Sequence, residues 1–335
     1  MNKLLLILVF GLVVCETDLD ALIFQQFKKF INKYQKKYES INEFLARYQV
    51  FKQNVMETLK EENSLYKTGI TKFSDLTKQE FKKIYLNLNY NAMAMANFDP
   101  TYVKVSNDVP DAYDWRDYGR VAPVKDQGSC GSCWAFATVA NLEGLYAKEK
   151  GVIKTFSEQM LVDCDNLDSG CNGGLEEEAY TWIKKNGGIM FDSDYPYTGR
   201  KGTCKSVASK YADFKVTGYK KLGSSSSVYS CADEDEMKQF LYENGPLSVA
   251  LNAEPLQTYV SGILDKSSSQ CKASEIDHAV SLVGMVLLQL TTGLSKTHGE
   301  KTGENLDISE SGEEKEPAVL TAMSFLLLFH SNYII

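Results

Sequence analysis

Apolar side chains near the start of the chain recur at helical spacing. Over residues 22–38, "LIFQQFKKFINKYQKKY", they fall at three- and four-residue steps between lysines and glutamines, as on a helix with one buried face. Residues 41–63 repeat the pattern, with one apolar stripe formed by Phe44, Tyr48, Phe51 and Val55. The sequence therefore predicts two amphipathic helices at the start of the folded chain.

Farther along, the pattern changes twice. Residues 86–107 lose the helical period, and the composition then shifts to Gly, Cys and Trp, so we expect an extended linker and a domain boundary near Asn107. From Cys133 a second helical pattern runs to Gly151, with its apolar stripe on Phe136, Val139, Leu142 and Leu145. Residues 277–284, "DHAVSLVG", alternate as a strand does.

Composition and charge narrow the class of protein. The 335 residues are 44% hydrophobic and 24% charged, as in a globular protein with one or two cores. The net charge of −8 and the lack of a long basic run argue against a nucleic-acid partner. The start, "MNKLLLILVFGLVVCETD", predicts a signal peptide over residues 1–15 that is too short to span a bilayer. The secretory route permits disulfides.

Removal of the signal peptide leaves seven of the eight cysteines, an odd number that keeps at least one thiol outside disulfides. Cys130 and Cys133 stand three apart, which also suits half of a metal site or a redox pair. A zinc site needs a second pair of ligands, and the chain has only three histidines, so we expect no metal and no cofactor. Cys133 begins the predicted helix, where the helix dipole favours a thiolate nucleophile.

The segment "VKDQGSCGSCWAFATV" resembles the cysteine segment of papain-like cysteine proteases, and "DHAV" resembles their histidine segment, 145 residues later (278 − 133). A histidine before an apolar run is by itself more often structural. The resemblance implies that Cys133 is the nucleophile and His278 its ion-pair partner and general acid and base. It also implies that the Gln127 amide and the backbone N–H of Cys133 bind the oxyanion.

The first two helices resemble the inhibitory prosegment of the same family. The pattern E-x3-R-x3-F-x2-N and the downstream "GITKFSDL" place matching residues at Glu43, Arg47, Phe51, Asn54, Gly69, Phe73 and Asp75. One inserted residue before Leu59 and Asn63, and Thr71 in place of an asparagine, depart from the family pattern. The resemblance implies that the prosegment runs through the substrate cleft backwards and inhibits until acid breaks charge pairs such as those of Asp75.

The stretch "GCNGGLEEEAY" resembles the family's substrate-binding segment. Gly173 and Gly174 would let a substrate backbone approach closely. The pocket for the second residue before the scissile bond would be formed by Leu175, Glu176, Ala250, Ile276 and Ala279. Asp277 is a further predicted substrate-binding residue. Glu176 is unusual in that pocket, because the family more often has an apolar residue. Its charge either admits a basic substrate residue or is solvated at the rim.

The resemblance also implies the disulfides Cys130–Cys171 and Cys164–Cys204, whereas the residues alone leave the connectivity open. Cys271 matches a family cysteine whose partner lies near the C-terminus, and no cysteine follows it here.

The tail departs from the family after Gly284. Residues 285–335 lack the "NSWG" motif whose asparagine orients the histidine, and their ending, "AVLTAMSFLLLFHSNYII", has polar breaks that disfavour a lipid anchor. Loss of one T after the Gly284 codon explains the departure. With that T restored, the codons of residues 296–300 permit Lys-Asn-Ser-Trp-Gly, and those of 316–318 permit Gly-Thr-Cys. The tail is thus interpreted as a frameshift product.

These observations predict an α+β protein of papain-like architecture. It would have a signal peptide (1–15), a prosegment (16–107), a peptidase domain (108–284) and an aberrant tail (285–335). A helical left domain would carry Cys133, and an incomplete, barrel-like right domain would carry His278. The predicted function is a monomeric cysteine endopeptidase zymogen, without a stable membrane anchor, that acts on polypeptides in a lysosome, a vacuole or the extracellular space.

Two other functions remain open. The chain is alternatively an impaired family member whose prosegment inhibits related proteases. A disulfide-rich binding protein is the third reading, but it leaves Gln127, Cys133 and His278 without a reason.

Overall fold

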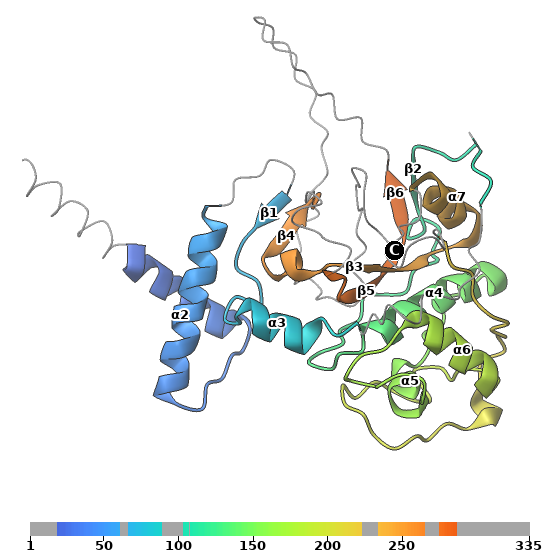
Figure 1. Ribbon diagram of the computed structural model, residues 1–335, viewed down its shortest axis with the longest axis horizontal. Helices are drawn as coiled ribbons and strands as arrows, with labels where there is room; N and C mark the ends of the chain where they lie inside the picture. Colours follow the sequence, from blue (N-terminus) through green and yellow to red (C-terminus); the bar gives the residue numbers. More distant parts are fainter. Residues whose placement is uncertain are drawn as a thin grey trace, which may run out of the picture.

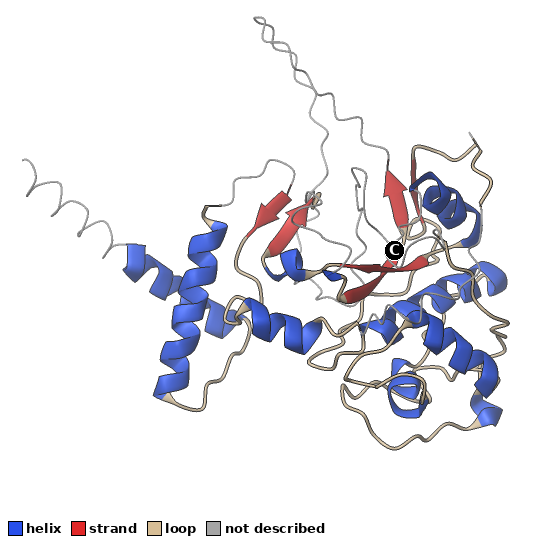
Figure 2. Ribbon diagram, viewed as in Figure 1, coloured by secondary structure: helices blue, strands red, loops and turns tan. Residues whose placement is uncertain are grey.

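The computed structural model describes residues 19–60, 66–88, 103–106, 108–222, 234–264 and 275–286 (Figure 1). The predicted signal peptide, Asn107, Cys231, Cys271 and residues 287–335 lie outside the described residues. Helices and strands are mixed along the chain, which confirms the α+β class (Figure 2). Across the described part of the chain, no helix is long and apolar enough to cross a membrane.

The two predicted amphipathic helices are present, over residues 19–33 and in α2 (Ile41–Thr58). They cross each other at one end of the molecule (Figure 1). Ser40 begins α2, since its hydroxyl accepts a hydrogen bond from the N–H of Glu43 at 3.1 Å. Between the helices Phe51 packs against Phe27 and Phe30, with ring centroids 5.0 Å apart in each pair. This aromatic core is separate from the cores of the peptidase part.

A strand pair and a capped helix join the prosegment to the rest of the chain. β1 (Tyr66–Thr68) pairs antiparallel with β4 (Tyr259–Gly262). The buried Thr71 hydroxyl donates to the carbonyl of Gln257 at 2.6 Å. α3 (Lys78–Tyr85) starts with a capping box formed by Thr77 and Glu80, and it runs toward α4 (Figure 1).

The helical part of the peptidase surrounds α4 (Cys133–Lys150), which the sequence predicts correctly. Gly151 ends it with a φ of 74°, in the left-handed region that favours glycine. α5 (Glu158–Cys164), α6 (Glu176–Asn186) and strands from the other part pack around α4. Because it is covered on several sides, α4 buries far more than the single predicted stripe, including Trp134 and Ala135. A short 3-10 turn, η1 (Ala208–Lys210), follows these helices.

The second part of the peptidase is built from strands. β3 (Leu247–Leu251) pairs antiparallel with β5 (His278–Leu282), and β2 (Ala112–Asp114) pairs antiparallel with β6 (Gly284–Val286). α7 (Glu234–Asn244) and the 3-10 turn η2 (Glu254–Gln257) complete it. Each sheet has two strands within the described residues. Met285, the first residue of the predicted aberrant tail, is still buried in this core.

β5 forms a strand as predicted, but all five of its residues are buried. Ala279 belongs to the core around α4, whereas Val280 and Leu282 belong to a second core with Trp115. The two faces of β5 therefore contact two different cores, and neither face is exposed to solvent. This position places His278 at the junction of the two parts of the peptidase.

Candidate active site

Cys133 is the first residue of α4 and is 1% exposed. The backbone N–H groups of Ala279 and Trp134 hydrogen-bond to its thiol. Among the described residues it is the one cysteine outside a disulfide. A helix N-terminus thus presents a single thiol to donors from the helix itself and from β5.

His278 opens β5, opposite Leu251 of β3, and its side chain is fully buried. α4 packs against β5, and the residue after His278 donates its N–H to the Cys133 thiol. The fold therefore brings together the two residues that the sequence selects as nucleophile and base, although 145 positions separate them (278 − 133).

Burial favours the neutral form of the Cys133 thiol in this form of the protein. Burial raises the pKa of the Cys133 thiol to about 12, and the charges of Glu176 and Asp277 raise it further, against the two N–H donors. Desolvation outweighs the helix N-terminus here, so the predicted thiolate needs a change in the surroundings of Cys133.

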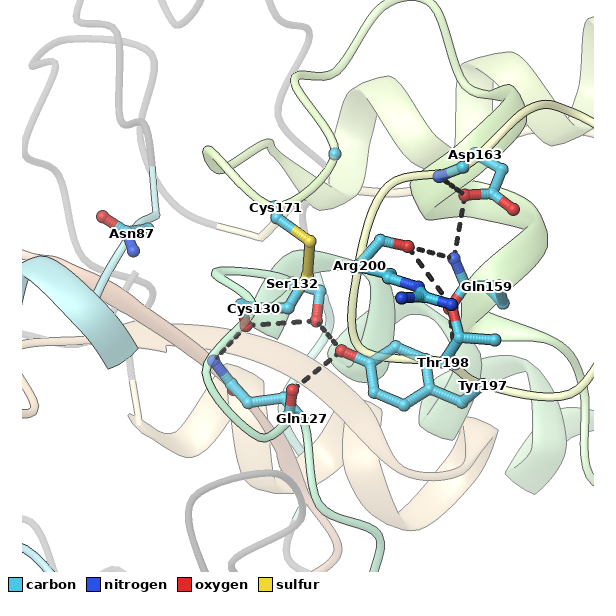
Figure 3. Close-up of a disulfide and its surroundings, with 12 residues drawn as sticks. Asn87, Gln127, Cys130, Ser132, Gln159, Asp163, Cys171, Tyr197, Thr198 and Arg200 are labelled. Atoms are coloured by element: carbon cyan, nitrogen blue, oxygen red, sulfur yellow. Dashed lines mark hydrogen bonds between the residues drawn. A yellow bond between two sulfur atoms is a disulfide. The ribbon is translucent and has the colours of Figure 1, made fainter. Parts of the chain in front are cut away.

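Gln127, the predicted oxyanion donor, is occupied by the prosegment. Its side-chain amide donates to the carbonyl of Tyr85 at 3.2 Å and to the carbonyl of Cys130 at 3.1 Å. Behind it, the Tyr197 hydroxyl donates to the Gln127 carbonyl at 2.8 Å and bonds to the Ser132 hydroxyl at 2.7 Å (Figure 3). This network fixes the loop that precedes Cys133.

Residues 86–88 follow Tyr85 into the site. The N–H of Leu88 donates to the carbonyl of Asp277 at 3.0 Å, and Leu88 pairs in parallel with Gly174. Its side chain lies in the same buried apolar cluster as three of the predicted pocket residues, Leu175, Ala250 and Ala279, and Ile276 packs against that cluster. The prosegment thus fills the pocket predicted for substrate, and the predicted linker begins as an ordered, extended segment.

The structure contains the two disulfides that the resemblance implies, Cys130–Cys171 and Cys164–Cys204. The first joins the Cys133 loop to the glycine segment (Figure 3). Because Cys130 is oxidised, the pair Cys130 and Cys133 is not a metal half-site in this state. No group of three or more His, Cys, Asp or Glu side chains suited to a metal ion occurs in the described part of the chain.

Gly173 and Gly174 also have a structural reason to be glycine, besides the predicted approach of a substrate backbone. Gly173 has a φ of 107°, which disfavours any side chain. A Cβ on Gly174 would lie 2.5 Å from Asp168 Oδ1 and 2.7 Å from Trp134 Cδ2. The segment's own packing therefore excludes a larger residue at Gly174.

Comparison with known proteins fits this geometry. Residues 109–287 match the profile described as papain family cysteine protease, and residues 27–81 match the cathepsin propeptide inhibitor domain. The chain belongs to the papain family of cysteine proteases. Its relatives include cysteine proteinase 15A of Pisum sativum, 40% identical over 77% of this chain and 71% of that protein. Cathepsin F of Mus musculus is 39% identical over 77% of this chain and 54% of its own length.

Solved structures of precursors share the fold of this papain-family protein. Digestive procathepsin L 3 of the Tenebrio molitor larval midgut superposes with a TM-score of 0.68 at 30% identity, over 78% of this chain and 84% of that one. Recombinant stem bromelain precursor gives a TM-score of 0.62 at 32% identity, over 78% and 82%. The papain-like architecture with a helical prosegment is thereby confirmed.

Two predicted substrate-binding residues of this papain-family protein carry carboxyl groups with altered pKa values. Glu176 is 8% exposed, so it is not solvated at a rim, and burial followed by the charge of Glu177 raises its pKa to about 8. Asp277 accepts from the N–H of Ala253 at 2.9 Å and lies 3.3 Å from the ammonium of Lys82 in the prosegment. Burial nevertheless raises the pKa of Asp277 to about 6.

Two partly buried groups of charged residues near the site are not predicted from the sequence. Asp168 accepts from the N–H of Leu175 at 2.8 Å, and burial, together with the adjacent carboxyl of Asp165, raises its pKa to about 8. Behind α4, the Lys125 ammonium lies 2.5 Å from Glu143 and 2.6 Å from Glu158. Neither group has a sequence signal, because its members look like ordinary turn or helix residues. Leu86 and Leu88 do carry one, since their period of two indicates an extended segment.

Proposed function

We propose that this chain is the zymogen of a cysteine endopeptidase in which Cys133 and His278 form a thiolate–imidazolium pair. The main observation in support is that the prosegment backbone occupies the groups that are predicted to bind substrate. The Tyr85 carbonyl accepts from the Gln127 amide, and Leu88 lies against Gly174 and the apolar pocket. A peptide carbonyl at the same donor is positioned for attack by the buried thiol at the start of α4.

The proposed reaction begins with transfer of the Cys133 proton to His278. Sγ adds to the carbonyl carbon of the scissile bond, and the side-chain amide of Gln127 and the backbone N–H of Cys133 stabilise the oxyanion. When the C–N bond breaks, the amine leaves with the imidazolium proton and the acyl group remains as a thioester. Water then gives a proton to His278 while its oxygen attacks the thioester. The C–S bond breaks, and the sulfur regains a proton.

The direction of the prosegment in the cleft explains why the peptidase does not cleave it there. Leu88 pairs in parallel with Gly174, and the family resemblance assigns the opposite direction to a cleavable peptide. The prosegment also keeps Cys133 buried, where the neutral thiol is favoured. Its departure would hydrate the site and lower the pKa of the thiol, because burial is the largest cause of the increase.

We further propose the division into signal peptide (1–15), prosegment (16–107), peptidase (108–284) and frameshifted tail (285–335), in a monomer on the secretory route to a lysosome, a vacuole or the exterior. The end of the peptidase match at residue 287 supports the division near Gly284. The lack of an "NSWG" motif in residues 285–335 favours a second candidate function. In that case the chain itself is inactive and its prosegment inhibits related proteases.

Expression of two coding sequences tests the function, one as given and one with a T restored after the Gly284 codon. Each is also prepared with Cys133→Ala. After purification and acidification, mass spectrometry follows release of the prosegment, and hydrolysis of a peptide substrate is measured. We expect activity from the restored form, loss of all activity with Cys133→Ala, and at least a 100-fold lower rate from the given form, because a positioned acid and base contributes roughly 10²–10⁴-fold.

Each outcome separates the proposals. Equal activity in the two forms rejects the frameshift interpretation. Activity that survives Cys133→Ala rejects the catalytic assignment. Inhibition of a related protease, without turnover by either form, supports the second function.

A further inference from the structure

Glu176 lies in the wall of a large cavity. The cavity has a volume of about 590 Å³ and is bounded by α4, α6, α7, β3 and the segment 214–222. Glu176 is the first residue of α6, and its side chain is buried. Tyr180, Ser248 and Ala250 line the cavity with it. Glu176 therefore lines a cavity next to the predicted substrate pocket, with Ala250 common to both.

The polar groups around Glu176 are bound to other partners. The Tyr180 hydroxyl donates to Asn141 at 3.0 Å and bonds to Ser248 at 2.8 Å. Lys221 forms an ion pair with Glu177, the next residue of α6. The Glu176 carboxyl accepts a hydrogen bond from its own backbone N–H, and the charge of Lys221 also lowers its pKa. The other cations in the cavity wall, Lys215 and Lys220, are exposed.

Glu176 is also close to the reacting groups. Its charge acts on the Cys133 thiol across the pocket. Leu88 pairs with Gly174, two residues before Glu176, and lies in the cluster that contains Leu175 and Ala250. Leu88 of the prosegment therefore marks the place of a substrate side chain, and Ala250 joins this cluster to the cavity that Glu176 lines.

We propose that Glu176 makes this pocket select a basic residue, arginine or lysine, as the second residue before the scissile bond. This inference rests on the proposed function. A guanidinium supplies several N–H donors in one plane and bonds a carboxylate at two points, and such charge-assisted hydrogen bonds are the stronger kind in a buried site. Leucine supplies no hydrogen-bond donor and no charge to the carboxyl.

The preference should depend on pH. Burial, then the charge of Glu177, raises the pKa of Glu176 to about 8, against the weaker opposite effect of Lys221. Below that pH the empty pocket holds the neutral acid, and a cation must displace its proton on binding. The ratio of rates for basic over leucine substrates therefore rises by up to roughly tenfold per pH unit as the pH approaches about 8, and then levels off.

The first experiment needs no catalysis and uses the proenzyme with Cys133→Ala. Leu88→Arg is compared with Leu88→Met, each with and without Glu176→Gln, by urea unfolding at pH 8.5. We expect Glu176→Gln to increase the unfolding constant of the Arg variant about tenfold more than that of the Met variant, because a buried charge pair loses its acceptor. Equal effects in the two backgrounds overturn the proposal.

The second experiment uses the activated, frame-restored enzyme with two peptides that differ only in arginine or leucine at the selected position. The ratio of their kcat/KM values is measured from pH 5 to pH 8. We expect the ratio to rise with pH and to become flat with Glu176→Gln. Glu178→Gln, on the same helix but outside the cavity wall, is the control and should keep the slope.

The two experiments distinguish failure of the pocket inference from failure of the proposed function. A flat ratio in the unaltered enzyme overturns the selection of basic residues. Absence of hydrolysis of both peptides counts against the proposed function, and the unfolding comparison then decides the inference about the pocket by itself.

Discussion

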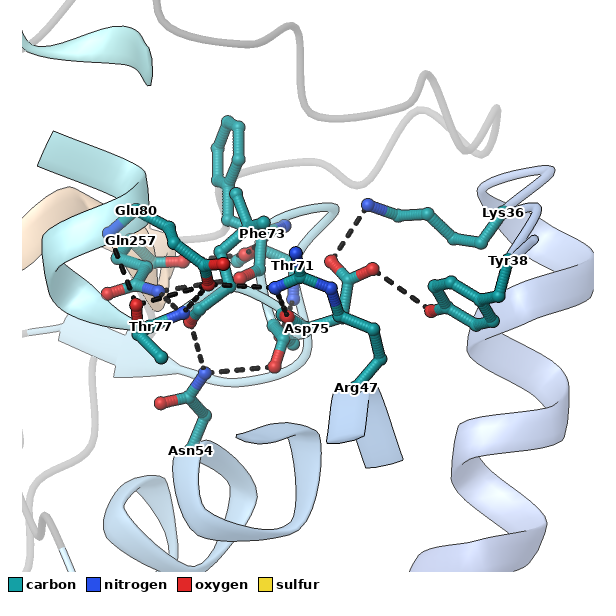
Figure 4. Close-up of polar contacts among 12 residues, drawn as sticks. Lys36, Tyr38, Arg47, Asn54, Thr71, Phe73, Asp75, Thr77, Glu80 and Gln257 are labelled. Atoms are coloured by element: carbon teal, nitrogen blue, oxygen red, sulfur yellow. Dashed lines mark hydrogen bonds and ion pairs between the residues drawn. The ribbon is translucent and has the colours of Figure 1, made fainter. Parts of the chain in front are cut away.

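Replacement of Asp75 by alanine should release the prosegment. Asp75 lies in the loop after β1, and its side chain is 4% exposed. It accepts from the Lys36 ammonium at 2.8 Å and from the Tyr38 hydroxyl at 3.0 Å, and so ties the first helical hairpin to the loop that leads into α3 (Figure 4). Arg47 donates to the Asp75 carbonyl at 3.1 Å, a contact that alanine retains.

The expected magnitude follows from these contacts. A hydrogen bond to a charged group contributes about 1.5–3 kcal/mol, so the loss of two corresponds to about 3–6 kcal/mol. The Lys36 side chain is 23% exposed, and water compensates part of its loss. We therefore expect Asp75→Ala to lower the free energy of unfolding of the prosegment by about 3 kcal/mol, which is roughly a 100-fold shift in its opening equilibrium.

The assay is performed on the whole proenzyme with Cys133→Ala, so that self-cleavage does not remove the prosegment. Urea unfolding followed by circular dichroism and limited digestion by an added protease, mapped by mass spectrometry, both report opening of residues 19–60. Glu57→Ala is the matched control, because Glu57 and Lys78 are 3.7 Å apart with both side chains about half exposed, a pair that contributes about 0–1 kcal/mol. Equal destabilisation by the two substitutions would refute the reasoning.

Two further predictions concern the peptidase part. Iodoacetamide should leave Cys133 unmodified in the proenzyme, where the thiol is buried and its pKa is about 12, and should alkylate it after the prosegment is removed. Label on Cys130 of the native protein, found by peptide mapping, would contradict the assignment. Asp168→Asn should reduce the loss of stability as the pH rises. Since the pKa of Asp168 is raised to about 8, its contribution is complete below about pH 3.8 and is lost as the pH rises through about 8, by at most about 1.4 kcal/mol per unit. Urea unfolding at pH 6 to 9 measures this, and identical slopes for the two proteins would show that Asp168 does not hold the proton.

The sequence by itself determined the parts that depend on local pattern. Helix periodicity placed the two prosegment helices and α4, and Gly151 marked the end of α4, because caps and stripes are properties of neighbouring residues. The motifs around Cys133 and His278 indicated the family and the chemistry. They also predicted which residues the fold would bring together.

Only the tertiary structure decided the electrostatics of the site and the path of the prosegment. Glu176 was equally compatible with a solvated rim, and the thiol of Cys133 with an ionised state, until packing removed water from both. Leu88 belonged to a predicted extended linker, and only the fold placed it against Gly174. Desolvation depends on segments that are far apart in the chain, such as α3, α4 and β5. No pattern of neighbouring residues records which of these segments will cover a given carboxyl or thiol, and that burial sets the pKa.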